Sequence, residues 1–123
     1  MPAGLIVFGH GSSVESANQA VRDVATGMAS QGGYALVETA FLEGGKPDLA
    51  GAASCLVARG ATQLVVLPYF LTLGLHLKRD LPALVTSLEV ILPGVDIKVA
   101  PPLDGHPALS TILLARAEEA LLA

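Results

Sequence analysis

The chain has 123 residues, of which 52% are hydrophobic and 4% aromatic, and its formal net charge at pH 7 is −4. This length fits one domain spanning residues 1–123, and a negative charge without any basic run excludes the usual surface of a nucleic-acid binder. The longest apolar run, residues 64–71, is far shorter than the about 20 residues of a membrane helix. We therefore expect a soluble, cytoplasmic protein with neither nucleic acid nor membrane as a partner.

The single cysteine, Cys55, lies in a predicted helix, where we expect it to be a core residue.

The first predicted strand and helix are separated by a short glycine-rich turn. Leu5–Phe8 is a continuous apolar run, and it ends in the Gly-His-Gly-Ser-Ser turn of residues 9–13. Ser12 and Glu15 have the spacing of a capping box, in which each side chain accepts a hydrogen bond from a free backbone N–H. This spacing predicts that a helix begins there, and it continues until two glycines interrupt the apolar periodicity.

The rest of the chain continues the same alternation of strands and helices. Apolar runs and helical spacing predict strands at residues 34–42, 62–71 and 95–100 and helices at residues 47–59 and 108–121, with a further helix that starts between residues 76 and 82 and ends at 92. Asp80 is the expected N-cap of the third helix, because Pro82 is tolerated in the first turn of a helix but not deep inside one. Strict alternation predicts an α/β fold with a parallel sheet and helices on both faces.

We expect the four strands to take the order 2-1-3-4. In that order the carboxyl ends of the first and third strands lie side by side at a topological switch point, where open α/β sheets bind ligands. Side chains just beyond these two strand ends, His10 and His76, would then face each other. The expected site therefore lies at the carboxyl edge of the sheet.

Three side chains able to bind metal or accept protons follow three predicted strands. His10 comes after the first strand, Glu43 after the second and His76 after the third. Two imidazoles and a carboxylate suit a divalent transition metal, and without metal the same groups accept protons near neutral pH. The plainer interpretation is that His10 fills a tight turn and the other two are solvated loop residues. Spacing alone leaves both interpretations open.

Other polar residues near the predicted site have ordinary structural interpretations. His106 is expected to be a turn residue before the last helix, and Ser12 and Ser13 fit caps better than nucleophiles because no nucleophile elbow is present. Lys78 and Arg79, the only adjacent basic pair, either contact substrate carboxylates or form ordinary surface. The chain has neither a phosphate-binding loop nor a dinucleotide fingerprint, which argues against ATP or NAD and leaves no organic cofactor.

Three motifs in this sequence resemble the short, single-domain sirohydrochlorin cobaltochelatase and ferrochelatase family. They are GHGS after the first strand, FLEGGKPDL at residues 41–49 and PYFLTLGLHLKRDLP at residues 68–82. The third motif is the most specific, and the match covers nearly the whole chain. The resemblance implies a three-layer chelatase-like fold.

The resemblance also implies roles for particular residues. Positions 10 and 76 correspond to the family's metal-binding and catalytic histidines, and Glu43 corresponds to the acidic residue that lines the same cleft. We therefore expect His10, His76 and Glu43 to be both metal ligands and catalytic residues. Weaker expectations for contacts to the substrate fall on Ser12, Ser13, Gly74, Lys78 and Arg79. Many relatives carry arginine where this chain has Ser13, which affects one substrate contact.

The activity implied by the resemblance is ATP-independent insertion of Co(II) into sirohydrochlorin in cobalamin biosynthesis, or alternatively of Fe(II) in siroheme biosynthesis. Ni(II) is less favoured, because the chain has no histidine-rich stretch. Family members of this length resemble half of a longer chelatase, which implies a homodimer.

Ligation of the metal needs unprotonated imidazole. We therefore expect activity to fall below about pH 6.5, the reference pKa of histidine. The rival functions are a non-catalytic metal or tetrapyrrole carrier and a small hydrolase or phosphotransferase.

Overall fold

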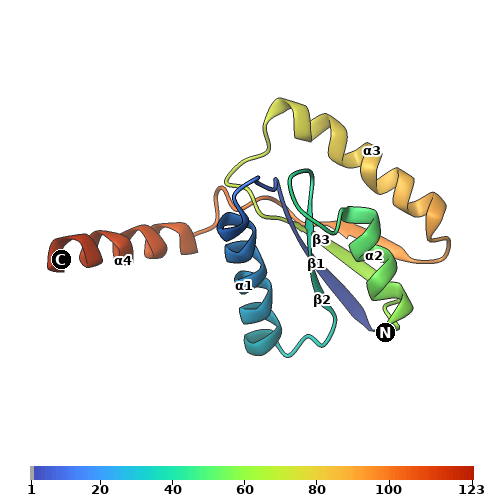
Figure 1. The fold of residues 1–123 in the computed structure, drawn as a ribbon, viewed down its shortest axis with the longest axis horizontal. Coiled ribbons are helices and arrows are strands. Elements are labelled where there is room, and N and C mark those ends of the chain that lie inside the picture. The colour runs from blue at the N-terminus through green and yellow to red at the C-terminus, as the bar shows by residue number, and fades with distance from the viewer. Residues whose placement is uncertain (1) are drawn as a thin grey trace.

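The computed structural model describes residues 2–123, with His76 described by its backbone alone. Strands and helices alternate along the chain (Figure 1) as β1 (Ala3–Gly9), α1 (Glu15–Gly32), β2 (Val37–Phe41), α2 (Leu49–Ala58), β3 (Gln63–Pro68), α3 (Leu75–Ile91), β4 (Asp96–Val99) and α4 (Ala108–Leu122). The predicted alternation is confirmed.

The four strands form one parallel sheet in the order β2-β1-β3-β4, which confirms the predicted order. Ile6 in β1 pairs with Glu38 on one side and with Val66 on the other, and Val66 pairs in turn with Val99 of β4. Because β1 and β3 are neighbours at the centre of the sheet, the loops that follow them leave the same edge side by side.

The main core lies between the sheet and helices α2 and α3. Ile6, Phe8, Leu64 and Val66 project from the central strands into this core and are almost completely buried. On the other face, α1 packs against β1 and β2. Helix α4 covers neither face and extends away from the sheet as a separate arm (Figure 1).

The predicted capping box at the start of α1 is wrong. The helix begins at Glu15 with Val14 as its N-cap, and no side chain makes a capping hydrogen bond. The Ser12 hydroxyl instead accepts a hydrogen bond from the Val14 N–H at 3.0 Å, and Glu15 pairs with Arg22, two turns further along the same face of α1. Ser12 therefore belongs to the turn before the helix. Hydrogen bonds between its backbone and the Asn18 side chain hold it there.

The predicted N-cap of α3 is also wrong, and the helix begins one residue before the predicted range of starts. The helix begins at Leu75 after the N-cap Gly74, so Asp80 lies inside the helix instead of capping it. Pro82 occupies a position deep in the helix and is exposed. Because proline has no N–H, the Lys78 carbonyl lacks its usual hydrogen bond within the helix. Lys78 is exposed, so water can bind this carbonyl instead, and the helix therefore tolerates the proline.

Helix α2 begins and ends as predicted, but its cysteine faces the other way. The Asp48 carboxylate accepts a hydrogen bond from the Gly51 N–H at 2.8 Å, which caps the first turn. Ala52 and Leu56 face the core and are fully buried, whereas Cys55 is exposed, with its sulfur 3.9 Å from a Glu38 oxygen. Among the described residues, no helix is long and apolar enough to span a bilayer.

Candidate active site

His10 and Glu43 meet at the carboxyl edge of the sheet, as the sequence predicts. Backbone hydrogen bonds run from the Leu42 N–H to the Gly9 carbonyl and from the Glu43 N–H to the His10 carbonyl, both at 3.0 Å. They hold the two loops together beyond the ends of β1 and β2. The His10 Nε2 atom consequently lies 3.5 Å from a Glu43 carboxylate oxygen.

The loop between β1 and α1 approaches the Glu43 backbone so closely that only glycine fits there. Gly11 has a φ of +91°, in the left-handed region, and a Cβ atom at this position would lie 1.5 Å from the Glu43 carbonyl oxygen. Both the backbone conformation and the space therefore require glycine. The Gly-His-Gly sequence thus serves to bring His10 beside Glu43.

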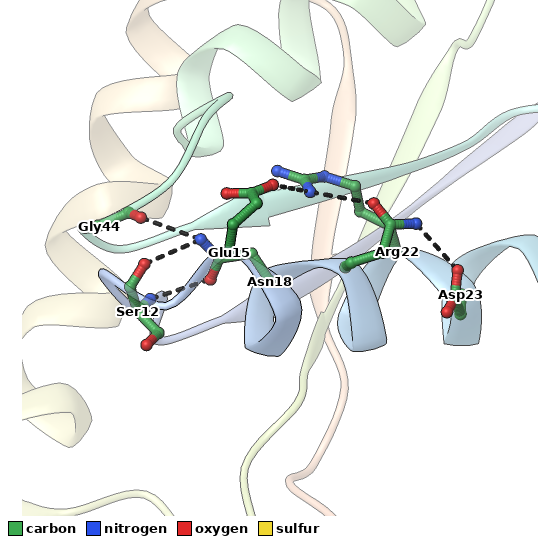
Figure 2. A network of polar contacts seen from close by, with 7 residues as sticks. Ser12, Glu15, Asn18, Arg22, Asp23 and Gly44 are labelled. Carbon is green, nitrogen blue, oxygen red and sulfur yellow. Dashed lines mark hydrogen bonds and ion pairs between the residues drawn. The ribbon is translucent and has the colours of Figure 1, made fainter.

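Asn18, a buried residue of α1, fixes both loops (Figure 2). Its Oδ1 accepts a hydrogen bond from the Ser12 N–H at 2.9 Å, and its Nδ2 donates to the Ser12 carbonyl at 2.9 Å and to the Gly44 carbonyl at 3.0 Å. One side chain thereby joins the segment after His10 to the segment after Glu43. Buried polar groups of this kind are costly to leave unpaired, so the loops are held firmly.

A second group of polar contacts on α1 lies next to Asn18 in Figure 2. Arg22 binds the Glu15 carboxylate, and its guanidinium carbon lies 5.4 Å from the centre of the Phe41 ring. The hydrogen bond and positive charge of Arg22 lower the pKa of Glu15 below its ordinary value. This ion pair is exposed to solvent and contributes little to the geometry of the site.

A cavity of about 220 Å³ opens beside His10. Its walls come from the loops after β1, β2 and β3 and from the start of α3, and they consist of His10, Leu42, Phe70, Gly74, Leu77 and Asp80. The rings of His10 and Phe70 meet edge to face, with centroids 6.5 Å apart and planes at 81°. The cavity is therefore mostly apolar, with one imidazole and one carboxylate in its wall.

The two nitrogen atoms of the His10 ring face different neighbours. Its Nδ1 lies 3.3 Å from the Gly11 carbonyl oxygen, while its Nε2 faces Glu43. When Nδ1 carries the proton and donates to that carbonyl, the Nε2 lone pair is available to a metal, which is the usual arrangement for metal-binding histidines. The side chains of His10 and Glu43 are 60% and 69% exposed, so an ion can reach both.

The third predicted ligand, His76, is the second residue of α3, immediately after the helix start that forms part of the cavity wall. Its side chain lies outside the described residues, so its predicted role stays a prediction. Across residues 2–75 and 77–123, no group of three His, Cys, Asp or Glu side chains is placed to hold a metal. His10 and Glu43 are the described donors that lie next to each other, and the Asp80 carboxylate belongs to the wall of the same cavity.

The remaining predicted residues divide between the cavity and its surroundings. Gly74 lines the cavity, whereas Lys78 lines a separate cavity between α3 and β4 and Arg79 is exposed on α3. Ser12 and Ser13 lie in the turn before α1. His106 is a turn residue, as predicted, since its Nδ1 accepts a hydrogen bond from the Ala108 N–H at 3.0 Å and it is not part of the cavity wall.

Sequence reasoning missed three residues that shape the site. Asp80 was expected to cap a helix and instead lines the cavity, and Phe70 was expected to build a strand and instead contacts the His10 ring. Asn18 had no assigned role. Its only signal in the sequence is its spacing from Ala25, seven residues later, which places both residues on the same face of the helix. The structure shows that both are buried.

Comparison with known proteins identifies relatives across the whole chain. The CbiX family model matches residues 4–120. A sirohydrochlorin cobaltochelatase of Sulfolobus acidocaldarius is 33% identical, over 96% of this chain and 92% of the relative. The chloroplastic sirohydrochlorin ferrochelatase of Arabidopsis thaliana is 30% identical over 96% of this chain, which spans only 52% of that relative.

Solved structures share the fold. A putative cobalamin biosynthesis CbiX protein of Marinobacter aquaeolei VT8 superposes with a TM-score of 0.85 and 28% identity, over 98% of both chains. SirB of Bacillus subtilis with Fe³⁺ superposes with a TM-score of 0.87 and 25% identity, over 98% of this chain and 48% of SirB. The chain thus corresponds to the full length of some relatives and to about half of others.

Proposed function

Because the chain belongs to the CbiX family, we propose that it is a chelatase that inserts a divalent metal into sirohydrochlorin without ATP. The observation that carries this proposal is the His10 and Glu43 pair at the mouth of an apolar cavity, with Nε2 and the carboxylate oxygen 3.5 Å apart. A nitrogen and an oxygen donor at one exposed point suit first-row transition ions.

Metal insertion exchanges two pyrrole N–H protons for one divalent ion, so the products are the metallated macrocycle and two protons. The protein has to bind the hydrated ion, replace part of its water shell and accept protons from the macrocycle. In our proposal, His10 Nε2 and a Glu43 oxygen bind the ion, and His76 is a third ligand. The carboxylate also offsets the positive charge of the ion, which lowers the cost of removing its water.

Asp80 supplies a second carboxylate, in the wall of the cavity beside His10. It lies in the cavity wall with His10, on the stretch of α3 one turn after position 76. A cavity carboxylate is suited to accept the protons that the pyrroles release, while Glu43 is occupied by the metal. We assign proton acceptance to Asp80 and metal binding to His10 and Glu43.

The substrate is too large for this cavity alone. Small-molecule sites usually measure roughly 300–1,000 Å³, whereas the cavity here is about 220 Å³, and a tetrapyrrole is larger than most ligands. One edge of the macrocycle fits against His10 and Phe70, and the rest extends beyond the chain. We therefore propose a homodimer in which a second copy completes the cleft.

Co(II) is the metal we propose, since relatives that this chain matches over nearly their whole length are named cobaltochelatases. Fe(II) is the alternative, supported by the ferrochelatase relative and by SirB with Fe³⁺. Imidazole and carboxylate donors accept both ions, and the choice depends on geometry and supply. Insertion of Co(II) would belong to cobalamin synthesis, and insertion of Fe(II) to siroheme synthesis.

A direct assay tests the function. Purified protein is mixed with sirohydrochlorin and Co(II), Fe(II) or Ni(II) under anaerobic conditions, and the macrocycle absorbance is followed against a control without protein. We expect catalysed insertion, fastest with Co(II) and independent of added ATP. A protein that binds Co(II) and sirohydrochlorin but leaves the uncatalysed rate unchanged would be a carrier, and this result would reject the chelatase.

Asp80→Asn tests the proton acceptor, because asparagine keeps the shape of the side chain but accepts protons poorly. We expect kcat to fall by about 100-fold, with the affinity for Co(II) unchanged and the rate partly restored by added carboxylate buffer. Glu89→Gln, on the same helix but outside the cavity wall, is the matched control and should keep full activity. A parallel loss of Co(II) affinity would show instead that Asp80 is a metal ligand.

A further inference from the structure

The imidazole of His10 is only loosely held by its polar contacts. The side chain is 60% exposed, and the hydrogen bond between its Nδ1 and the Gly11 carbonyl oxygen is long, at 3.3 Å. Its Nε2 lies 3.5 Å from Glu43, but in the proposed function this nitrogen binds the metal and no longer pairs with the carboxylate. A metal-binding histidine normally has a firm partner that fixes its ring, so His10 needs a further contact.

The ring of Phe70 supplies this contact. It meets the imidazole edge to face, with the centroids 6.5 Å apart and the planes at 81°. This separation and this angle are those of a favourable aromatic pair. A change of the His10 side chain to another rotamer would lose the contact. The Phe70 ring therefore favours the orientation in which Nε2 faces Glu43.

Phe70 is itself firmly anchored. Its ring packs against the ring of the buried Phe8, with centroids 6.3 Å apart and planes at 66°. The Phe70 carbonyl accepts a hydrogen bond from the Leu103 N–H at 3.0 Å, and the preceding residue, Tyr69, donates its N–H to the Phe8 carbonyl at 2.8 Å. Phe70 therefore connects the rigid centre of the sheet to the exposed side chain of His10.

We propose that Phe70 is a positioning residue, whose ring holds the His10 imidazole in the orientation that binds the metal. This inference rests on the proposed function, in which His10 Nε2 is a metal ligand, and it adds a residue that acts through His10. The hydrogen bond from Leu103 extends the support to the loop after β4. The loops after all four strands then contribute to the metal site.

The physical effect of the ring is to raise the fraction of molecules that are ready to bind metal. Without it, the exposed imidazole samples other rotamers, and only the molecules with Nε2 beside Glu43 bind the ion well. The apparent affinity for the metal is reduced in proportion to that fraction. The ring also lowers the conformational entropy that His10 loses when the ion binds.

Phe70→Leu tests this role, because it removes the aromatic contact and keeps an apolar side chain in the cavity wall. We expect the affinity for Co(II), measured without macrocycle from the visible spectrum of the bound ion, to fall about 10-fold. Phe70→Tyr keeps the ring and should bind Co(II) as tightly as the wild type. If Phe70→Leu does not fold, Phe70→Met is measured in its place with the same expected loss.

The matched control is Leu42→Ala. It also removes an apolar group from the cavity wall, but it leaves the rings of Phe70 and His10 in contact, so it should bind Co(II) with wild-type affinity. Equal Co(II) affinities for the wild type and Phe70→Leu would overturn the proposal, and so would an equal loss in Phe70→Leu and Leu42→Ala.

A double-mutant cycle with His10→Ala separates positioning from a general effect on the fold. Because Phe70 acts through His10 in the proposal, adding Phe70→Leu to His10→Ala should leave the Co(II) affinity of His10→Ala unchanged. A further loss of similar size in that background would show that Phe70 acts elsewhere and would reject the role. A His10→Ala variant with wild-type affinity would reject it as well, since Phe70 would then have no ligand to position.

These measurements use Co(II) alone, so they separate the positioning role from the proposed activity. A wild type that inserts no metal, but loses Co(II) affinity with Phe70→Leu and not with Phe70→Tyr, would reject the chelatase and support the role of Phe70. An active wild type with the same Co(II) affinity as Phe70→Leu would support the chelatase and reject the role of Phe70.

Discussion

Replacing His10 by alanine is expected to reduce metal insertion by about 100-fold or more, because even partners that only orient a metal ligand typically contribute 10–100-fold. His10 is exposed, and the described side chains that contact it are Glu43 and the edge of the Phe70 ring, so the fold should be unaffected. The rate is measured from the macrocycle absorbance, and Co(II) affinity is measured from the visible spectrum of the bound ion. Both should fall together.

The matched control for this variant is His106→Ala. It removes the same type of side chain from the turn before α4, outside the cavity wall, and should leave insertion unchanged. If His10→Ala and His106→Ala insert Co(II) equally fast, His10 is not a metal ligand and the proposed site is wrong.

Replacing Asn18 by alanine is expected to destabilise the protein by about 2–4 kcal/mol, because three hydrogen bonds are lost at a buried position. The loops that carry His10 and Glu43 lose their common anchor, so activity should fall even at temperatures where the variant remains folded. Urea unfolding gives the first quantity and the insertion assay the second.

Asn18→Asp separates hydrogen bonding from packing. It keeps the size of the side chain but puts a carboxylate against the Ser12 and Gly44 carbonyls, so it should be destabilised at neutral pH as well. Gln19→Ala, the next residue on α1, is the matched control, since its contacts are exposed and its loss should cost less than about 0.5 kcal/mol. An Asn18→Ala variant as stable and active as this control would show that the loops do not depend on Asn18.

The sequence was sufficient for the architecture, since the signals involved are local. Apolar runs and helical spacing mark the strands and helices, and Asp48 and Gly60 mark the ends of α2 through a side-chain cap and a φ of +111°. Once the strand order is known, the positions of His10 and Glu43 follow, because parallel strands end at the same edge. Their meeting was therefore predictable from topology.

The errors came where long-range contacts override local rules. Ser12 has the spacing of a cap, but the Asn18 amide binds its backbone and keeps it in the turn. Pro82 indicated a late start for α3, yet its exposure allows the helix to begin at Leu75, and this places Asp80 in the cavity wall. The spacing of Asn18 from Ala25 places it on the inner side of α1 but does not indicate which loops it binds, and no local pattern around Asp80 reveals its place in the cavity wall.

Helix α4 illustrates a different limit. Its helical spacing correctly predicts a helix at about residues 108–121, but nothing in these residues indicates where the helix lies relative to the sheet. The direction of α4 depends on hydrogen bonds between the loop before it and the end of β3, which lie about thirty residues apart in the chain. The sequence therefore predicts the helix but not its packing partner.

Backbone atoms alone make the two hydrogen bonds that join the strand ends at Gly9, His10, Leu42 and Glu43. The spacing between the main chains at positions 10 and 43 therefore depends little on side chains, since it follows the separation common to neighbouring strands. In the proposed site, substitutions that change metal preference would act through the cavity wall at Phe70 and Leu77 or through His76, the proposed third ligand. Selection for a new metal in the proposed site would thus reshape the wall while the main chains at positions 10 and 43 keep their spacing.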